Sequence, residues 1–194
     1  AGVANVITTT AKIRVVPVSS WKATASESPE FSIKTNITLA RPALNESVYV
    51  YNAPYQPLSY PVTGTYTGTV GKVKLEYSGN GDAGPWTNIA TIDTNGDGTY
   101  AYNWQVPNVI TNTAKVRVLD ADSGHPAAEG RSSSFLIKGT LIVDNPASGS
   151  SVTYQDNVPI SWTAVGSFKP VKIEYSTNNV GSWIVTEITV STTC

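Results

Sequence analysis

Apolar and polar residues alternate along many short stretches of this chain, with the two-residue period that is typical of β-strands. Val73 and Leu75 share one face of a strand predicted over residues 72–77. Val116 and Val118 share one face of a second predicted strand, so we expect both to be core residues. No stretch has the period of a useful amphipathic helix, and the pattern therefore predicts an all-β protein.

Turn signals separate the predicted strands. Residues 79–82 and 93–98 are rich in Gly, Asn and Asp, which tolerate the backbone angles of tight turns. The first predicted strand starts at residues 37–39 and ends at residues 41–42, and residues 58–60 open the third. The other predicted strands lie at residues 47–51, 72–77, 86–92, 99–105, 114–118 and 134–137. Roughly seven or eight short strands with turns every 8–12 residues favour an immunoglobulin-like β-sandwich.

The composition agrees with this class and narrows the range of partners. Val, Ile, Thr and Tyr, which fit a pleated and half-buried surface, are abundant. Charged residues make up only 14% of the chain, and the net charge of −1 has no cluster of either sign. A nucleic-acid partner would need a basic face, so we expect no nucleic acid. No apolar run approaches the roughly 20 residues of a spanning helix, so we expect no membrane span.

The chain contains an internal repeat with a spacing of about one hundred residues, the size of one sandwich domain. Residues 5–15 recur at 108–118, with nine of the eleven positions identical. Residues 73–78 recur at 171–176, and a tryptophan follows each copy at a nearly equal distance. The order of these matches predicts that the sequence starts within one domain, passes through a complete second domain and stops within a third.

Three segments follow from this repeat. Residues 1–35 are predicted to be the closing strands of one immunoglobulin-like repeat, and residues 36–139 a complete β-sandwich. Residues 140–194 are predicted to be the opening strands of another repeat. The strand at residues 98–104 has no clear counterpart in either partial repeat.

The motifs of the repeat resemble those of a known class of extracellular domains. The motifs are Val-Lys-Ile-Glu-Tyr-Ser at 171–176, Gly-Ser-Trp at 181–183, Tyr-Asn-Trp-Gln-Val-Pro at 102–107 and Ala-Lys-Val-Arg-Val at 114–118. They look like tandem immunoglobulin-like or fibronectin-III-like repeats of large bacterial and archaeal surface proteins. They are similar also to the domain of the Ser/Thr-rich GPI-anchored cell-wall family. The resemblance implies a secreted or cell-surface protein with a role in adhesion, spacing or wall structure, and no catalytic residues.

The sharpest candidate for a metal site is the turn from Asp93 to Gly98. Asp93, Asn95 and Asp97 match the first half of the Asp-x-Asn-x-Asp-Gly calcium loop, in which alternate side-chain oxygens face one ion. The twelfth position of such a loop would be Trp104 rather than Glu. The alternative is a plain hairpin turn with no cofactor.

Catalysis finds little support in the sequence, and we expect no enzymatic activity. The single histidine, His125, lies in a loop near Asp120 and Asp122, where we expect it to be a solvated loop residue. Glu76 and Glu174 recur at one repeat position, which favours solubility or a cross-strand ion pair over acid–base chemistry.

The aromatic residues raise a second hypothesis, in which they form a stacking platform for sugar rings. The candidates are Trp86, Trp104, Trp183, Tyr100 and Tyr102. The alternative is structural packing, because Trp86 with Trp183, and Tyr60 with Trp162, are expected at equivalent repeat positions.

Two functions remain open at this stage. The first is a structural subunit or segment of an extracellular fibre, in which copies assemble head to tail by completing split domains. The second is a carbohydrate-binding or adhesive accessory module that contacts surface glycans. The sequence has no Met and its single cysteine is Cys194, so we expect N-terminal processing or a piece of a longer chain, without an internal disulfide.

Overall fold

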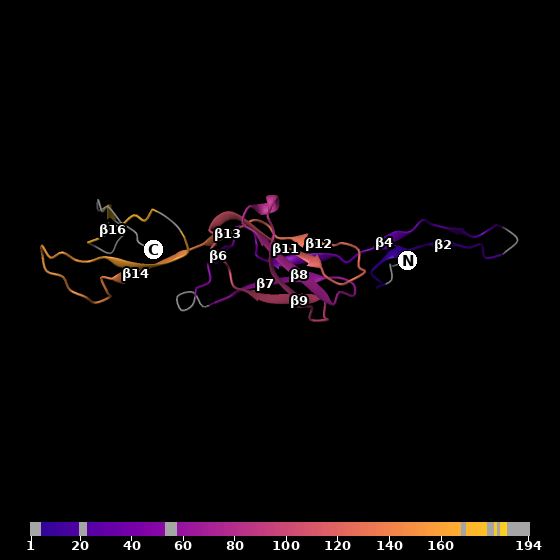
Figure 1. The fold of residues 1–194 in the computed structure, drawn as a ribbon, viewed down its shortest axis with the longest axis horizontal. Helices are drawn as coiled ribbons and strands as arrows, with labels where there is room; N and C mark the ends of the chain where they lie inside the picture. The colour runs from indigo at the N-terminus through magenta and orange to yellow at the C-terminus, as the bar shows by residue number, and fades with distance from the viewer. Residues whose placement is uncertain are drawn as a thin grey trace.

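The computed structural model describes residues 5–19, 23–52, 58–167, 170–177, 181 and 183–185, and Cys194 lies outside them. Within this part of the chain every regular element is a β-strand, apart from one 3-10 turn, η1 (Gly81–Ala83). The prediction of an all-β protein is therefore confirmed. Two central sheets lie between strand pairs that project from opposite ends of an elongated molecule (Figure 1).

The central part contains two sheets. The first has the antiparallel order β10 (Thr99–Trp104), β7 (Tyr60–Tyr66) and β5 (Ile37–Arg41). The second has the order β6 (Ser47–Tyr49), β13 (Phe135–Lys138), β11 (Thr111–Asp120), β8 (Lys72–Ser78) and β9 (Thr87–Asp93). β12 (Glu129–Arg131) also pairs with β11, while β6 and β13 are parallel. β12 was not predicted, because Glu-Gly-Arg has no apolar alternation.

Both sheets contribute side chains to one hydrophobic core, which is consistent with a β-sandwich. Val116 and Val118 of β11 are 0% exposed, so the prediction that they are core residues is confirmed. Val73 and Leu75 of β8 are equally buried, and Val62 of β7 joins them in the core from the other sheet. Each such side chain contributes about 1.5–3 kcal/mol relative to full exposure.

Aromatic rings link the two sheets at one end of the core. The ring centroid of Trp104, from β10, lies 5.3 Å from that of Tyr77 and 6.5 Å from that of Phe135. The contact with Phe135 is edge to face, a geometry that aromatic pairs prefer. Trp104 is only 4% exposed and therefore belongs to the core.

Tyr100 of β10 requires a glycine on the neighbouring strand. Its hydroxyl donates a hydrogen bond of 2.5 Å to the backbone oxygen of Thr38. A Cβ atom on Gly64 would lie 2.0 Å from that oxygen and 2.1 Å from the tyrosine hydroxyl. Only glycine leaves room for this bond between the strands, and burial raises the pKa of Tyr100.

Candidate assembly surfaces and polar sites

The N-terminal strand pair, which we call the head hairpin, repeats the pairing found in the central sheet. It contains β1 (Thr8–Ala11), β2 (Arg14–Val15), β3 (Ser26–Glu27) and β4 (Phe31–Ile33). Its Cα partners are Thr8 with Ile33, Ala11 with Phe31, and Arg14 with Glu27. The matching pairs in the centre are Thr111 with Ile137, Ala114 with Phe135, and Arg117 with Arg131. The sequence repeat is therefore also a repeat of backbone register.

Hydrogen bonds at the bend of the hairpin repeat in the same way. The backbone N–H of Ile13 donates to Ser28 Oγ at 2.9 Å, and the N–H of Ser28 donates back to the Ile13 oxygen at 2.8 Å. In the central sheet Val116 and Ser132 exchange the same two bonds, both at 2.9 Å. In both copies the serine therefore hydrogen-bonds to the facing residue through its side chain as well as its backbone, at the point where the two paired segments of the strands meet.

The head hairpin differs from its central counterpart in burial. Ile13 and Val15 are 58% and 68% exposed, whereas the matching Val116 and Val118 are 0% exposed. The same strand, in the same register, is a core strand in one copy and has an uncovered apolar face in the other.

The C-terminal strand pairs, which we call the tail strands, match the opening strands of the central sheets. They are β14 (Thr140–Asn145) with β15 (Ser161–Val165), and β16 (Glu174–Tyr175) with β17 (Ile184–Val185). Val143 pairs with Trp162 as Leu39 pairs with Gly64, and each pairing is followed by a register shift. Trp162 is therefore equivalent to Gly64, and its expected equivalence to Tyr60 is wrong.

The tail strands also leave apolar side chains uncovered. Leu141 and Val143 of β14 are 46% and 66% exposed, while Ile37, the counterpart of Leu141, is 4% exposed. Tyr175 and Ile184 are each nearly half exposed. The tail therefore presents an open apolar face, as the head hairpin does.

A charged cluster lies on the outer face of the central sheet, where β8 and β11 meet. Glu76 and Arg117 are direct Cα partners, and Arg117 Nη2 lies 2.6 Å from Glu76 Oε2. Lys74 Nζ lies 2.7 Å from Glu76 Oε1, and the Arg117 guanidinium lies 4.5 Å from the centroid of the Trp86 ring. Burial alone would raise the pKa of Glu76, but hydrogen bonds from Lys74 and Arg117 outweigh burial, so the pKa is lowered.

This cluster was predicted only in part. Glu76 does form the cross-strand ion pair, yet it is 6% exposed and so has no solvating role. Trp86 was expected to pack in the core or hairpin, but its ring contacts Arg117 and Arg131 outside the core cluster. Planar guanidinium groups stack favourably on tryptophan.

Equivalent positions meet at the two junctions where the central sheets join the head hairpin and the tail strands. At the tail junction, Asn108 Nδ2 donates to Ser167 Oγ at 2.7 Å, and Ser167 N–H donates to Asn108 Oδ1 at 2.8 Å. There a Cβ atom on Gly166 would lie 3.0 Å from the Ile110 side chain. At the head junction Gly68 takes the place of Gly166, and Asn5 and Ile7 take the places of Asn108 and Ile110. A Cβ atom on Gly68 would lie 3.2 Å from the Ile7 side chain and 3.5 Å from that of Asn5.

These two junction glycines have a backbone reason as well. Gly68 and Gly166 adopt φ values of 85° and 102°, which side-chain-bearing residues rarely adopt. Both junctions therefore place an equivalent glycine against an equivalent Asn-x-Ile segment.

The predicted calcium loop forms the turn between β9 and β10. Asp93 pairs with Lys72, and Asp97 Oδ1 accepts hydrogen bonds from Thr99 N–H at 2.9 Å and Thr99 Oγ1 at 2.6 Å. Asn95 donates through Nδ2 to Thr99 Oγ1 at 2.9 Å. The hydrogen bonds from Thr99 lower the pKa of Asp97. These bonds are those of an ordinary polar hairpin turn, and the calcium site stays a prediction.

A second polar cluster joins His125 to Asp120 and Asp122, and the expectation for its histidine was wrong. His125 is not a solvated loop residue: its side chain is 20% exposed, and Nδ1 lies 2.8 Å from Oδ2 of Asp120, which is 1% exposed. Asp122 Oδ2 lies 3.7 Å from the same nitrogen and accepts the N–H of Gly71 at 2.6 Å. The hydrogen bonds tie the loop 120–125 to the start of β8.

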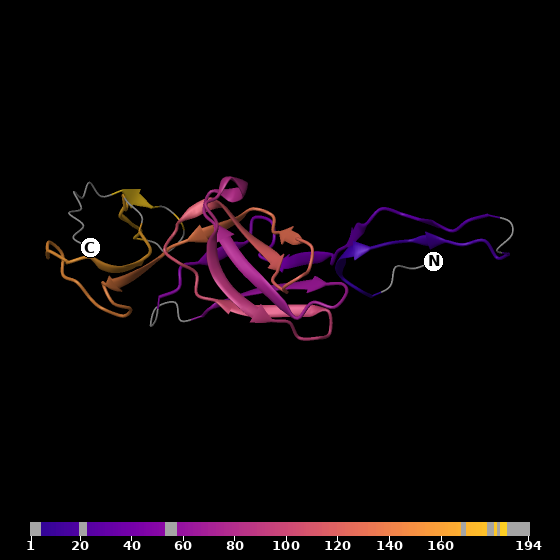
Figure 2. The same cartoon turned by 45° about the vertical axis from the view of Figure 1, so that its right-hand side comes forward.

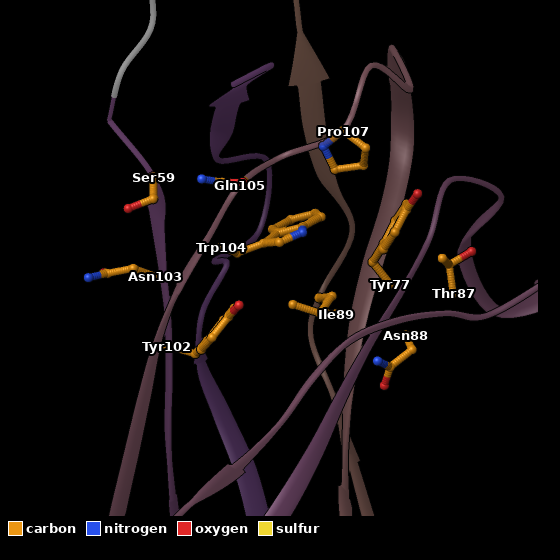
Figure 3. A pocket seen from close by; sticks show the side chains of 10 residues that line it. All are labelled: Ser59, Tyr77, Thr87, Asn88, Ile89, Tyr102, Asn103, Trp104, Gln105 and Pro107. Atoms are coloured by element: carbon orange, nitrogen blue, oxygen red, sulfur yellow. The ribbon is translucent and has the colours of Figure 1, made fainter. Parts of the chain in front are cut away.

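The candidate residues of the sugar-platform hypothesis lie in different environments, and the structural-packing alternative holds for Tyr100 and Trp104. Tyr100 and Trp104 are core residues, Trp86 lies beneath two arginines, and Trp183 is 63% exposed on the tail. Two of these candidates, Tyr102 and Trp104, line a groove of about 540 Å³ between the edge strands β9 and β10 (Figure 3). It is lined by Ser59, Tyr77, Thr87, Asn88, Ile89, Tyr102, Asn103, Trp104, Gln105 and Pro107.

No protein-family model, no curated protein and no solved structure matches this chain. In the part of the chain that the structure describes, no helix is both long and apolar enough to cross a membrane.

Proposed function

We propose that this chain is a non-enzymatic structural protein, a subunit or segment of an extracellular fibre built from immunoglobulin-like sandwiches. The strand order supports the immunoglobulin-like assignment. In chain order β5, β7 and β10 occupy the places of strands A, B and E, and β8, β11 and β13 those of C, F and G.

One observation carries the proposal. Ile13 and Val15 are exposed on the head hairpin, whereas the same positions of the same strand in the central sheet, Val116 and Val118, are fully buried. In the head hairpin β1 and β2 together correspond to β11, and in the central sheet β11 pairs with β8. The tail strands include β16, the counterpart of part of β8. A head hairpin of one copy therefore completes the tail strands of the next copy.

The positions of head and tail favour open-ended assembly over closure within one chain. The two sets of strands lie at opposite ends of the molecule in both views (Figures 1 and 2). A contact between different surfaces of successive copies is heterologous, and it propagates as a filament unless its rotation closes a ring. If the parent polypeptide continues with further repeats, the same junction is made within one chain.

Sedimentation velocity and electron microscopy of the 194-residue chain test the proposal. We expect concentration-dependent fibres, which Val15→Asp abolishes because it places a charge on the uncovered core face. Val16→Asp is the matched control: Val16 is also exposed, at 56%, but its counterpart Leu119 lies on the other side of the strand. A compact monomer at every concentration overturns polymerisation between chains, and the intact mass of the native material then distinguishes a tandem array.

The extracellular setting rests on two potential glycosylation sites. Asn36 and Asn45 begin Asn-x-Thr/Ser sequences, and both residues are exposed. Mass spectrometry of the native protein, before and after enzymatic deglycosylation, tests whether they carry glycans. Unmodified asparagine at both positions removes this support.

The groove between β9 and β10 favours glycan binding as a second function. It combines the rings of Tyr77 and Tyr102 with the amide side chains of Asn88, Asn103 and Gln105, which suit stacking and hydroxyl hydrogen bonds (Figure 3). Glycan-array binding that is lost in Tyr102→Ala supports this function, and the absence of any binding glycan contradicts it.

A further inference from the structure

We propose that assembly pairs Arg14 of one copy directly with Glu174 of the next, with the Arg14 guanidinium stacked on Trp183 of that next copy. The inference rests on the proposed function. It specifies which residues of the two copies face each other across the new strand pair, and which charged contact holds them in that register.

The central sheet contains the same contact in finished form. Arg117 lies opposite Glu76 on the neighbouring strand, bonds its carboxylate at 2.6–2.7 Å, and covers the ring of Trp86. Arg14 is the counterpart of Arg117, because residues 5–15 repeat at 108–118 in sequence and in register.

The acidic half of the contact is already arranged on the tail. Glu174 pairs with Val185 as Glu76 pairs with Asn88, so it holds the same place in its strand pair. Lys172 forms an ion pair with Glu174, as Lys74 does with Glu76. Trp183 directly precedes β17, as Trp86 directly precedes β9.

Both halves are accessible in the single chain. The side chain of Arg14 is 64% exposed, and its ion pair with Glu27 is loose, at 3.8 Å. Trp183 is 63% exposed, and the side chain of Glu174 is 34% exposed, whereas that of Glu76 is 8% exposed. In the central sheet the Arg117 side chain covers Glu76 and Trp86. Within one chain, no equivalent arginine is paired with Glu174 or Trp183 among the contacts of the described residues.

This pairing fixes the register between copies. With Arg14 opposite Glu174, Ile13 faces Tyr175 and Val15 faces Ile173, as Val116 faces Tyr77 and Val118 faces Leu75 in the centre. A slip of two residues in one direction would set Arg14 opposite Lys172, where like charges repel, and in the other direction opposite Ser176, which carries no charge to attract it. A slip of one residue would turn the apolar face outward. The charged pair therefore selects one register.

Charge reversal tests the contact on the full 194-residue chain. Arg14→Glu places two carboxylates opposite each other, and Glu174→Arg places two guanidinium groups opposite each other. We expect each variant alone to assemble at a critical concentration about 100-fold higher than the unaltered chain, because like charges in an interface cost several kcal/mol. Glu174→Gln, which removes the attraction without repulsion, should raise it by about 10-fold.

An equimolar mixture of the two charge-reversed chains provides the matched control. The head of the Arg14→Glu chain meets the tail of the Glu174→Arg chain with opposite charges in contact again. At the next junction the unaltered Arg14 and Glu174 meet. We expect the mixture to form alternating fibres at nearly the original critical concentration. Circular dichroism melts of each variant confirm that the central sheets are intact.

The possible results separate the inference from the proposed function. If the unaltered chain forms fibres and both variants do so equally well, the Arg14–Glu174 contact is wrong and head-to-tail assembly stands. If the variants fail alone and also fail when mixed, the substitutions act on folding of the strands and the direct contact is overturned. If the unaltered chain never assembles, the contact between separate copies is overturned together with polymerisation, and the intact mass of the native material decides whether the protein is instead a segment of a tandem array.

Discussion

Arg117 and Glu76 face each other across β11 and β8, and the carboxylate of Glu76 is held between Arg117 and Lys74. Glu76 is 6% exposed although it lies on the outer face of the sheet, because long side chains cover it. Removal of one partner would leave a nearly buried carboxylate with half of its bonds. We expect Arg117→Met to lower the free energy of unfolding by about 2 kcal/mol, measured by urea denaturation.

The same ion pair predicts a loss of stability in acid. The pKa of Glu76 in the folded state lies below its usual value of about 4.3. Its stabilising contribution is therefore complete above the usual pKa and is lost as the pH falls through the lowered folded-state value. We expect Glu76→Gln to flatten the fall in unfolding free energy below about pH 5. Glu129→Gln, at a half-exposed site, is the control, and an equal flattening there would contradict the assignment to Glu76.

Residues 36–139 are predicted to fold without the head hairpin or the tail strands. The two central sheets and nearly all of the core cluster lie within this range. We expect the isolated segment to give a β-type circular dichroism spectrum and a single cooperative melt. A helical spectrum, or a melt without cooperativity, would show that the ends are needed for folding.

Two equivalent residues, Val116 and Ile13, should differ in how much their truncation lowers the stability of the single chain. Val116 is fully buried, so Val116→Ala should lower the unfolding free energy by about 1–3 kcal/mol. Ile13 is 58% exposed, so Ile13→Ala should change the unfolding of the single chain by less than about 0.5 kcal/mol. If Ile13 is buried on assembly, its truncation should instead weaken fibres, which sedimentation measures.

Calcium should have little effect on stability. The side chains of Asp93, Asn95 and Asp97 already bond to Lys72 and Thr99, and the loop lacks the final acidic ligand of a calcium loop. We expect the melting temperature to be the same in calcium and in a chelator. A rise of many degrees that Asp97→Ala removes would establish the site.

The sequence by itself determined the all-β class, most of the central strands and the internal repeat. Alternation placed Val73, Leu75, Val116 and Val118 correctly, because a two-residue period fixes which side chains share a face of a strand. The repeat of residues 5–15 at 108–118 anticipated the matching register of the head hairpin, since similar segments form similar local pairs.

Only the tertiary structure decided which side chains meet. β12 gained its pairing with β11 without an apolar pattern, and His125 turned inward to Asp120 although its loop is polar. Trp162 became the equivalent of Gly64 through strand register rather than residue likeness. Burial of Val118 and exposure of Val15 could not be read from nearly identical sequences, because burial depends on whether a second sheet covers the strand.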